Sequence, residues 1–335
     1  MRELNIGKKE AGQRMDKYLK KYFREAGSGF LYKMLRKKNI VLNDKKAEGS
    51  EMLQEGDSIK LYLAEETIEK FRGAAEELPV VAAKKKTALD IVYEDENFLI
   101  VNKPAGILSQ KAAPNDVSMV ELLIDYMLEN KQITRDELQI FHPSVCNRLD
   151  RNTSGLLLAG KTLAGLQEFS RILKERNMKK YYLCLVKGIV EKENHCKAYL
   201  VKDRKNNQVK ISMHPAQDAE YIETAYEPLW HGKDVTLLKV ELITGKSHQI
   251  RSHLASLGYP LAGDSKYGDK RWNQELKEKV GLSHQFLHAW RIEFPKQEGI
   301  LLPLSEKRIQ SNLPEMLCKV LDYVDYPKSK EYFEL

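Results

Sequence analysis

The sequence predicts an α+β protein in two parts, a small basic module followed by a larger domain of mixed strands and helices. Its 335 residues are enough for two domains with sizeable cores. Positive charge is concentrated at the start, because residues 1–62 hold 15 Lys and Arg against 9 Asp and Glu, a net of +6 against +7 for the chain. After residue 89, segments that alternate with the period of a strand are interspersed with apolar stripes at helical spacing.

The first 62 residues are predicted to form a compact αβ module. Two helices and two strands are expected there, over residues 14–23, 30–38, 40–42 and 58–62. Ser28 is placed to cap the second helix, and Asn39 to adopt the left-handed conformation that often ends one. Residues 63–88 show no sustained period, so we expect a flexible linker over that range.

The second of these helices is strongly basic. Its polar positions and its end carry four cations, Lys33, Arg36, Lys37 and Lys38. Clustered positive charge is typical of nucleic-acid binding, although a solvated lysine-rich face is a common alternative. We expect this helix to contact a nucleic acid.

The larger domain is expected over residues 89–305. Its predicted elements, in chain order, are a strand–turn–strand unit over 91–101, helices over 117–128 and 163–173, strands over 180–186 and 236–243, and a helix over 247–257. The segment 180–186 is apolar on both alternating faces, as expected of a buried central strand. The last helix is expected to bury Ile250, Leu254 and Leu257, and residues 306–335 to form a helical tail packed on this domain.

One loop of this domain concentrates charged groups. Asp150 lies between Arg148 and Arg151 in a polar loop that runs into Leu156-Leu157-Leu158. A carboxylate beside permanent cations stays ionised at neutral pH, and guanidinium groups offer planar, multi-donor contacts to phosphate. The loop therefore predicts a catalytic carboxylate that acts on a nucleotide.

A second cluster surrounds the helix predicted over 247–257. Lys246 lies in a basic turn at its N-terminus, where unpaired amides can hold a phosphate. His248 and Arg251 are one turn apart, on a face distinct from the apolar one. With Asp264 nearby in a Gly-Asp pair, these residues are expected to belong to the site.

The segment 155–162 matches the phosphate-binding Walker A pattern letter for letter. A phosphate-binding loop of that kind follows a buried strand, whereas here a polar loop comes first and a Leu-rich run takes the place of the loop. We therefore predict a buried strand in this segment and keep an NTPase only as a rival interpretation.

Several longer motifs resemble those of the RluA-type family of pseudouridine synthases, and they occur in the family order. They are Asn102-Lys103-Pro104-Ala105-Gly106, residues 148–156, Lys180-Tyr181-Tyr182, residues 244–254, residues 258–264 with Tyr267-Gly268, and residues 285–289. The first module resembles the S4-type RNA-binding domain, in residues 14–19, the basic second helix, residues 41–44 and Gly56-Asp57.

The resemblance implies a mixed, mostly antiparallel sheet with flanking helices, and isomerisation of uridine to pseudouridine in RNA after the target base is flipped out. Asp150 matches the essential aspartate, which either attacks the sugar or abstracts a proton from it. Tyr182 matches the tyrosine that packs on the base and is tied to proton transfer from C5, with Tyr181 as its rival. Arg251 matches the arginine that pairs with the aspartate, and Arg148 the residue that enters the RNA stack.

The remaining substrate-binding candidates are Arg151, Lys180, Lys246 and His248. The chain departs from the family pattern at Asn147, where members commonly have a histidine.

Large-subunit ribosomal RNA is the expected substrate and transfer RNA the alternative. A catalytically idle RNA-binding or ribosome-assembly protein on the same fold is a second hypothesis; the presence of Asp150, Tyr182 and Arg251 together argues against it.

The expected reaction and the composition together predict the cofactors, the state of the cysteines and the location of the protein. The expected reaction involves no redox change, phosphoryl transfer or hydrolysis, so we expect neither a metal nor an organic cofactor. The four cysteines have no paired spacing, and reduced thiols are expected. No apolar run is long enough to cross a bilayer, and the start of the chain has no signal-peptide core. We expect a cytoplasmic monomer with RNA as its partner, and neither DNA nor a membrane.

Overall fold

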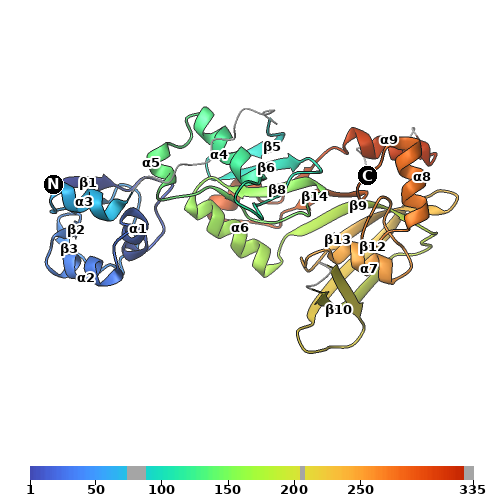
Figure 1. The fold of residues 1–335 in the computed structure, drawn as a ribbon, viewed down its shortest axis with the longest axis horizontal. Helices are drawn as coiled ribbons and strands as arrows, with labels where there is room; N and C mark the ends of the chain where they lie inside the picture. The colour runs from blue at the N-terminus through green and yellow to red at the C-terminus, as the bar shows by residue number, and fades with distance from the viewer. Residues whose placement is uncertain (74–87, 204–207, 328–335) are drawn as a thin grey trace.

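The N-terminal domain packs three helices against a four-stranded antiparallel sheet in the computed structural model, which describes residues 1–73, 88–203 and 208–327 (Figure 1). The helices are α1 (Met15–Tyr22), α2 (Ser28–Arg36) and α3 (Glu65–Arg72). The strands, in sheet order, are β1 (Arg2–Asn5), β4 (Ser58–Leu61), β2 (Ile40–Leu42) and β3 (Lys45–Lys46). Both predicted helices and both predicted strands are present.

The helix α3 lies inside the segment predicted to be a flexible linker, 63–88, so that prediction is wrong for these residues. Ile68 is fully buried in the core of the N-terminal domain, and the ring of Phe71 lies 4.2 Å from that of Phe30. Two apolar residues three positions apart are too few to show helical periodicity, so tertiary packing decides the conformation here. The rest of the predicted linker, 74–87, lies outside the described residues.

Both helix-end assignments around α2 are also wrong. Ser28 is the first helical residue, Gly27 is the N-cap, and no side chain caps the helix. Lys38, with φ of 61°, takes the left-handed conformation expected of Asn39. The backbone amide of Asn39 instead donates to the Met34 carbonyl, which closes the helix one residue earlier.

The larger domain is built on an 11-stranded sheet. Its main path runs β11 (Gln208–Ser212), β10 (Asn194–Asp203), β12 (Glu220–His231), β13 (Val235–Leu242), β9 (Lys179–Lys187), β14 (Leu287–Glu293), β8 (Ser154–Gly160), β6 (Phe98–Lys103), β5 (Ile91–Glu94). Off this path, β7 (Ser144–Val145) pairs with β8 and β15 (Arg308–Gln310) with β14. The β8–β14 pair is parallel and the other described pairs are antiparallel, which confirms the predicted mixed, mostly antiparallel sheet.

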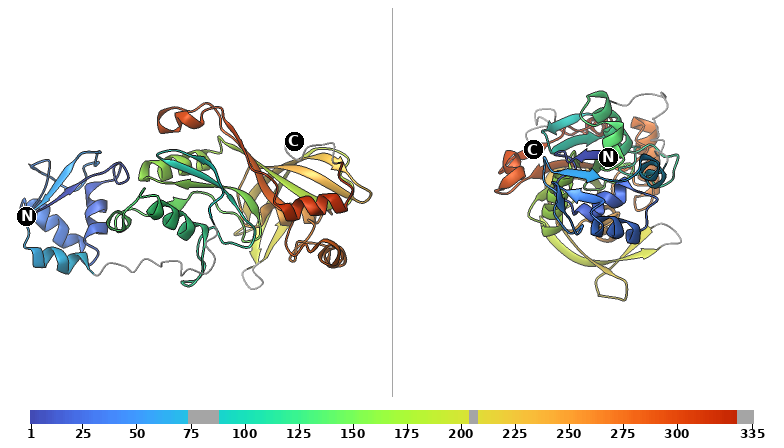
Figure 2. Two further views of the ribbon diagram at one scale, coloured as in Figure 1. Left: turned by 90° about the horizontal axis from the view of Figure 1, so that it is seen from above. Right: turned by 90° about the vertical axis from the view of Figure 1, so that its left-hand side faces the viewer.

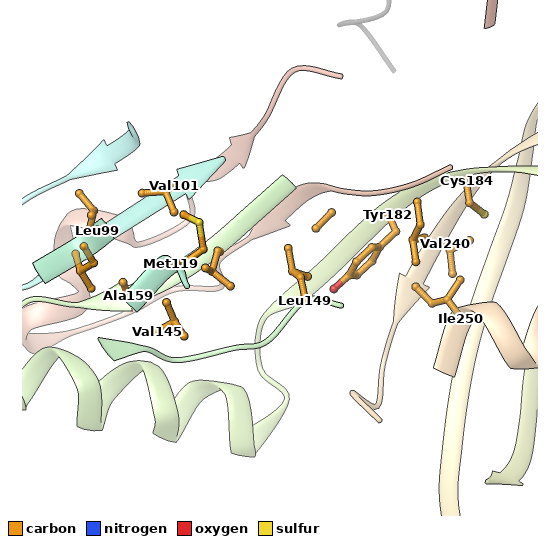
Figure 3. Packing of buried hydrophobic residues seen from close by; sticks show 14 of the residues in the cluster. Leu99, Val101, Met119, Val145, Leu149, Ala159, Tyr182, Cys184, Val240 and Ile250 are labelled. Atoms are coloured by element: carbon orange, nitrogen blue, oxygen red, sulfur yellow. The ribbon is translucent and has the colours of Figure 1, made fainter. Parts of the chain in front are cut away.

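Helices cover both faces of this sheet. Its helices are α4 (Met119–Glu129), α5 (Arg135–Leu138), α6 (Leu163–Glu175), α7 (Gln249–Ser256), α8 (Lys270–Val280), the 3₁₀ helix η1 (Gly299–Leu304) and α9 (Glu315–Tyr323). One apolar cluster joins α4 and α7 to one face, and Figure 3 shows Leu99, Tyr182, Val240 and Ile250 within it. On the opposite face, α6 and η1 cover one half of the sheet and α8 and α9 the other.

The two strands that hold the site confirm what the sequence predicts for them. Along β9, Tyr182 and Cys184 belong to the cluster with α4 and α7, while Leu183 and Leu185 belong to the cluster with α8 and α9. Every residue of β8 is buried, and its backbone pairs with β6 and β14. Lys161 binds Glu94 at 2.6 Å, so the Walker A match is a strand and an ion pair.

Gly155 is required where β8 and β14 run parallel. Its φ is +108°, a conformation that L side chains rarely adopt, and an added Cβ would lie 2.2 Å from the Ala289 carbonyl oxygen. The two strands come closest at the start of β8, directly after the charged loop. A side chain at this position would push the loop out of place.

The end of the chain packs as the sequence predicts, with one addition. Leu317, Val320 and Leu321 of α9 lie against Trp272 and Leu276 of α8. The addition is β15, a strand in the segment expected to be a helical tail.

Three further observations concern the end of α7, the placement of the two domains and the length of the helices. Leu257 is 36% exposed, against the prediction that it is buried, because α7 ends at Ser256. The N-terminal domain lies at one end of the molecule beside α5, with α8 and α9 at the other (Figures 1 and 2). Within the part of the chain that the structure describes, no helix combines the length and apolar character needed to span a membrane.

Candidate active site

The charged loop between β7 and β8 opens onto a cleft formed with β9 and α7. Its lining residues are Arg148, Leu149, Asp150, Thr153, Tyr182, Leu242, Lys246, His248, Gln249, Ile250, Arg251 and Leu287. The structure therefore brings together six of the residues predicted for the site, from segments more than a hundred positions apart. Arg151 and Lys180 do not line the cleft.

The loop is held by hydrogen bonds on either side of Asp150. The Ser109 hydroxyl accepts from the Leu149 amide at 3.0 Å and donates to the Leu149 carbonyl at 2.9 Å. The Lys103 ammonium donates to the Arg151 carbonyl at 2.9 Å and to the carbonyls of two residues in the following turn. The backbone of Asp150 is thus fixed before and after its side chain, which orients the carboxylate.

Lys103 is a site residue to which sequence reasoning assigned no role. Its side chain is fully buried, and burial lowers its pKa to about 7, although the charge of Asp150 opposes this. A lysine between a strand and a Pro-Ala-Gly turn was the available signal. That pattern does not predict the buried ammonium, because its carbonyl partners come from two separate loops that meet only in the folded chain.

Arg251 bridges two carboxylates. Its Nη1 donates to Asp150 Oδ2 at 2.7 Å, while Nε and Nη2 donate to the two oxygens of Asp264 at 2.6 and 2.8 Å. Burial opposes the charged form of both Arg251 and Asp264, yet their pairing outweighs it: the pKa of Arg251 is raised and that of Asp264 is lowered. The guanidinium is therefore a fixed cation that Asp264 aims at Asp150.

The two candidate tyrosines lie on opposite faces of β9. Tyr182 is buried in the cleft, and Figure 3 shows its hydroxyl directed toward the loop at Leu149. Burial, and then the charge of Asp150, raise the pKa of Tyr182, so its hydroxyl is protonated at neutral pH. Tyr181 faces the other side, with the Lys239 ammonium 5.3 Å from its ring centre.

His248 lies beside the ion pair of Asp150 and Arg251. It is the N-cap of α7, which begins at Gln249, two residues later than expected, and its φ of 55° is left-handed. Its Nε2 is 4.0 Å from Asp150 Oδ2, and its Nδ1 is 2.9 Å from the hydroxyl of Tyr267. Burial is the main cause that lowers the pKa of His248.

The remaining cations differ in availability. Lys246 forms an ion pair with Glu220 at 2.7 Å, and its amide donates to the Gln249 side chain, so this amide is not free for phosphate as predicted. Arg148 and Arg151 are exposed and form no ion pair with the described residues. Lys180 is partly buried on the same face of β9 as Tyr182; burial, and then the charge of Arg176, lower its pKa.

Two other groups near the loop have structural roles. Asn147 accepts a hydrogen bond from the Leu158 amide at 2.8 Å, so it ties the loop to β8. Burial raises the pKa of the Cys146 thiol to about 12, which makes it a poor nucleophile. Among the residues that the structure describes, no group of His, Cys, Asp or Glu has the arrangement of a metal site.

The comparisons with known proteins agree with this site. A family model described as RNA pseudouridylate synthase matches residues 97–256. Ribosomal large subunit pseudouridine synthase C of Pasteurella multocida is 30% identical over 331 residues, which are 97% of this chain and 94% of the relative. The protein of the same name from Escherichia coli K12 is 30% identical over 316 residues, 89% of this chain and 94% of the relative.

A solved structure supports the fold. Human RNA pseudouridylate synthase domain containing 4 aligns with a TM-score of 0.56, covering 70% of this chain and 93% of its own. The two sequences are 19% identical, so this likeness concerns the fold alone.

Proposed function

The chain belongs to the RluA-type family of RNA pseudouridine synthases, and on this basis we propose that it converts particular uridines of large-subunit ribosomal RNA to pseudouridine. The relatives that match nearly the whole chain carry that substrate in their names. The observation that carries the proposal is the ion pair between Asp150 and Arg251 beside a buried, protonated Tyr182.

The arrangement suits a reaction at one nucleotide taken out of the RNA stack. The glycosidic bond from C1′ to N1 breaks, the uracil turns, and C1′ bonds to C5, which loses its proton while N1 gains one. Asp150 is proposed to act on the ribose, either by attack on the sugar or by proton abstraction from it. The hydroxyl of Tyr182 is proposed to lie against the base and to carry the C5 proton.

Two arginines are proposed to support the reaction once the uridine has flipped out of the RNA stack. Arg251 is proposed to hold the carboxyl group of Asp150 in position through its hydrogen bond of 2.7 Å. Arg148 is exposed at the edge of the cleft, and a planar guanidinium can stack in the gap that the uridine leaves. Arg151, Lys180, Lys246 and His248 are proposed as contacts to the RNA near the flipped nucleotide.

We propose that the N-terminal domain is an S4-type RNA-binding arm. The cations Lys33, Arg36, Lys37 and Lys38 are exposed along and just after α2, and none forms an ion pair with the described residues. The two helices and two strands expected from the sequence are present, which supports this proposal. Unpaired cations on one helix can release counterions from RNA phosphates. The enzyme is proposed to act as a cytoplasmic monomer.

Mapping of pseudouridine in cellular RNA tests the function. Large-subunit ribosomal RNA and transfer RNA would be compared between cells with the gene, without it, and complemented by it. We expect one or more ribosomal pseudouridines to disappear with the gene and return on complementation. Loss confined to transfer RNA would transfer the proposal to that substrate, and no loss in either class would contradict it.

A further inference from the structure

The hydroxyl of Tyr267 connects the active site with the hairpin of β10 and β11. It accepts a hydrogen bond from the Val209 amide of β11 at 2.9 Å, and it lies 2.9 Å from Nδ1 of His248. The ring of Tyr267 packs against a small apolar cluster formed by this hairpin and β12, with the residues Ala198, Leu200, Val209 and Ile222. One side chain therefore touches both the hairpin and a residue of the cleft.

These two contacts decide where the proton of His248 resides. A backbone amide can only donate, so the phenol oxygen is the acceptor from Val209, and its single proton is left for Nδ1 of His248. In the opposite arrangement the phenol would accept twice, and its own proton would have no acceptor among the described residues. Nδ1 is thus the acceptor, and a neutral imidazole must carry its proton on Nε2.

His248 is neutral in the resting site. Burial lowers its pKa, and the positive charges of Arg251 and Lys266 act in the same direction. The carboxylates of Asp150 and Asp264 oppose them and do not reverse the shift. The uncharged tautomer is therefore the form present at neutral pH.

The Nε2 proton faces the cleft. Nε2 lies 4.0 Å from Asp150 Oδ2, too far for a hydrogen bond, so this donor is available to a bound ligand. The backbone of His248 is strained in this position, because its left-handed φ of 55° is uncommon for a residue with a side chain. The ring of Tyr267 also lies 5.3 Å from the Arg251 guanidinium, which leaves little freedom at this junction.

We propose that Tyr267 is a positioning residue that fixes His248 as its Nε2–H tautomer, so that a neutral donor beside Asp150 binds an oxygen of the flipped uridine. This assignment of the donor to a uridine rests on the proposed function; the tautomer does not. The same hydroxyl joins the donor to β11, so the hairpin and the cleft hold His248 together.

The tautomer can be measured without any activity assay. Long-range proton–nitrogen spectra of the full chain labelled with ¹⁵N-histidine would be recorded at neutral pH, with His248→Gln used to assign the signal. We expect an unprotonated Nδ1 and a protonated Nε2 in the wild type. In Tyr267→Phe, which keeps the ring, we expect a mixture of tautomers. A wild-type His248 that is protonated on Nδ1 would overturn the proposal.

Kinetics test the donor. Tyr267→Phe and His248→Gln should each lower kcat/KM for pseudouridine formation about tenfold, and the double variant should lose little more, because both changes remove one hydrogen-bonded unit. Tyr126→Phe is the matched control, since it removes a hydroxyl that donates to Glu94 at 2.6 Å, and neither residue lines the cleft. Fully additive losses would contradict the coupling. A wild type with the expected tautomer but no pseudouridine product would refute the function and leave the tautomer standing.

Discussion

The residues of the site are arranged around one cation shared by two carboxylates. Arg251 binds Asp264 through two hydrogen bonds and Asp150 through one. Asp264 is completely buried, whereas Asp150 keeps 26% of its side chain exposed toward the cleft. Asp264 thus supplies the fixed partner, and the exposed carboxylate remains available to react.

Replacing each of the two tyrosines by Phe tests which face of β9 takes part in the reaction. Tyr182→Phe should lower the rate of pseudouridine formation by about a hundredfold or more, since it removes the hydroxyl proposed to carry the C5 proton. RNA affinity should change little, because the ring remains. Tyr181→Phe is the matched control and should leave the rate unchanged. Single-turnover assays with binding measurements decide this, and impairment of the Tyr181 variant alone would contradict the assignment.

The buried ammonium of Lys103 should make stability depend on pH. Its pKa is about 7 in the folded protein, below the ordinary 10.5. Between these values the unfolded chain binds a proton at Lys103 that the folded chain lacks, so the free energy of unfolding rises with pH, by at most about 1.4 kcal/mol per unit. Below about pH 7 both states are protonated and this contribution is constant.

Lys103→Met removes this titration. Urea unfolding of wild type and variant from pH 6 to 10 should show a difference in free energy of unfolding that grows with pH across the upper part of the range. The variant also loses the hydrogen bonds to three carbonyls, which lowers its stability at every pH. A difference that stays constant with pH would contradict the buried, titrating lysine.

Among the secondary-structure elements, the parallel pair of β8 and β14 sets the position of the charged loop that contains Asp150. Gly155→Ala places a Cβ against the Ala289 carbonyl, so we expect a loss of about 3 kcal/mol or more in free energy of unfolding. Gly258→Ala is the matched control, because Gly258 also has a positive φ but its Cβ would meet nothing within 4 Å. That variant should lose only about 1 kcal/mol. Equal losses in thermal unfolding would contradict the steric argument.

The sequence predicts elements well where a local pattern is strong. The apolar strands β8 and β9 are predictable because burial on both faces leaves a continuous hydrophobic run. The helix α3 is not, because its two core-facing residues, Ile68 and Phe71, are too few to show a helical period and their apolar partners lie elsewhere in the chain. Asp150 is predictable from the sequence because it lies between two arginines in one short loop. The roles of Lys103 and Tyr267 are not, because their partners are carbonyls, amides and rings that come close only in the folded chain.

At the scale of the whole molecule, the two domains are joined through contacts at α5. Lys9 forms an ion pair with Glu137 at 2.8 Å, and Arg72 lies 3.5 Å from Asp136. Ile140 packs against the core of the N-terminal domain. Because α3 belongs to that domain, the arm extends to about residue 73, beyond the boundary at 62 that the sequence suggests.

Neutralising the basic helix tests the arm. Replacement of Lys33, Arg36, Lys37 and Lys38 by Gln should weaken RNA binding and flatten its dependence on salt, by roughly 0.7–0.9 in the slope of log K against log salt for each lost phosphate contact. Chemistry at saturating RNA should persist, since none of these residues lines the cleft. Binding titrations at several salt concentrations measure both effects, and an unchanged slope would contradict an RNA-binding arm.

The proposed role of Asp150 is tested most directly by Asp150→Asn in purified protein. This change keeps the size of the side chain and removes the carboxylate that Arg251 holds at 2.7 Å. Pseudouridine formation in a large-subunit ribosomal RNA fragment would be measured beside RNA binding for wild type and variant. We predict that the variant binds RNA within a few-fold of the wild type and forms no pseudouridine. A variant that forms pseudouridine at the wild-type rate would contradict the account.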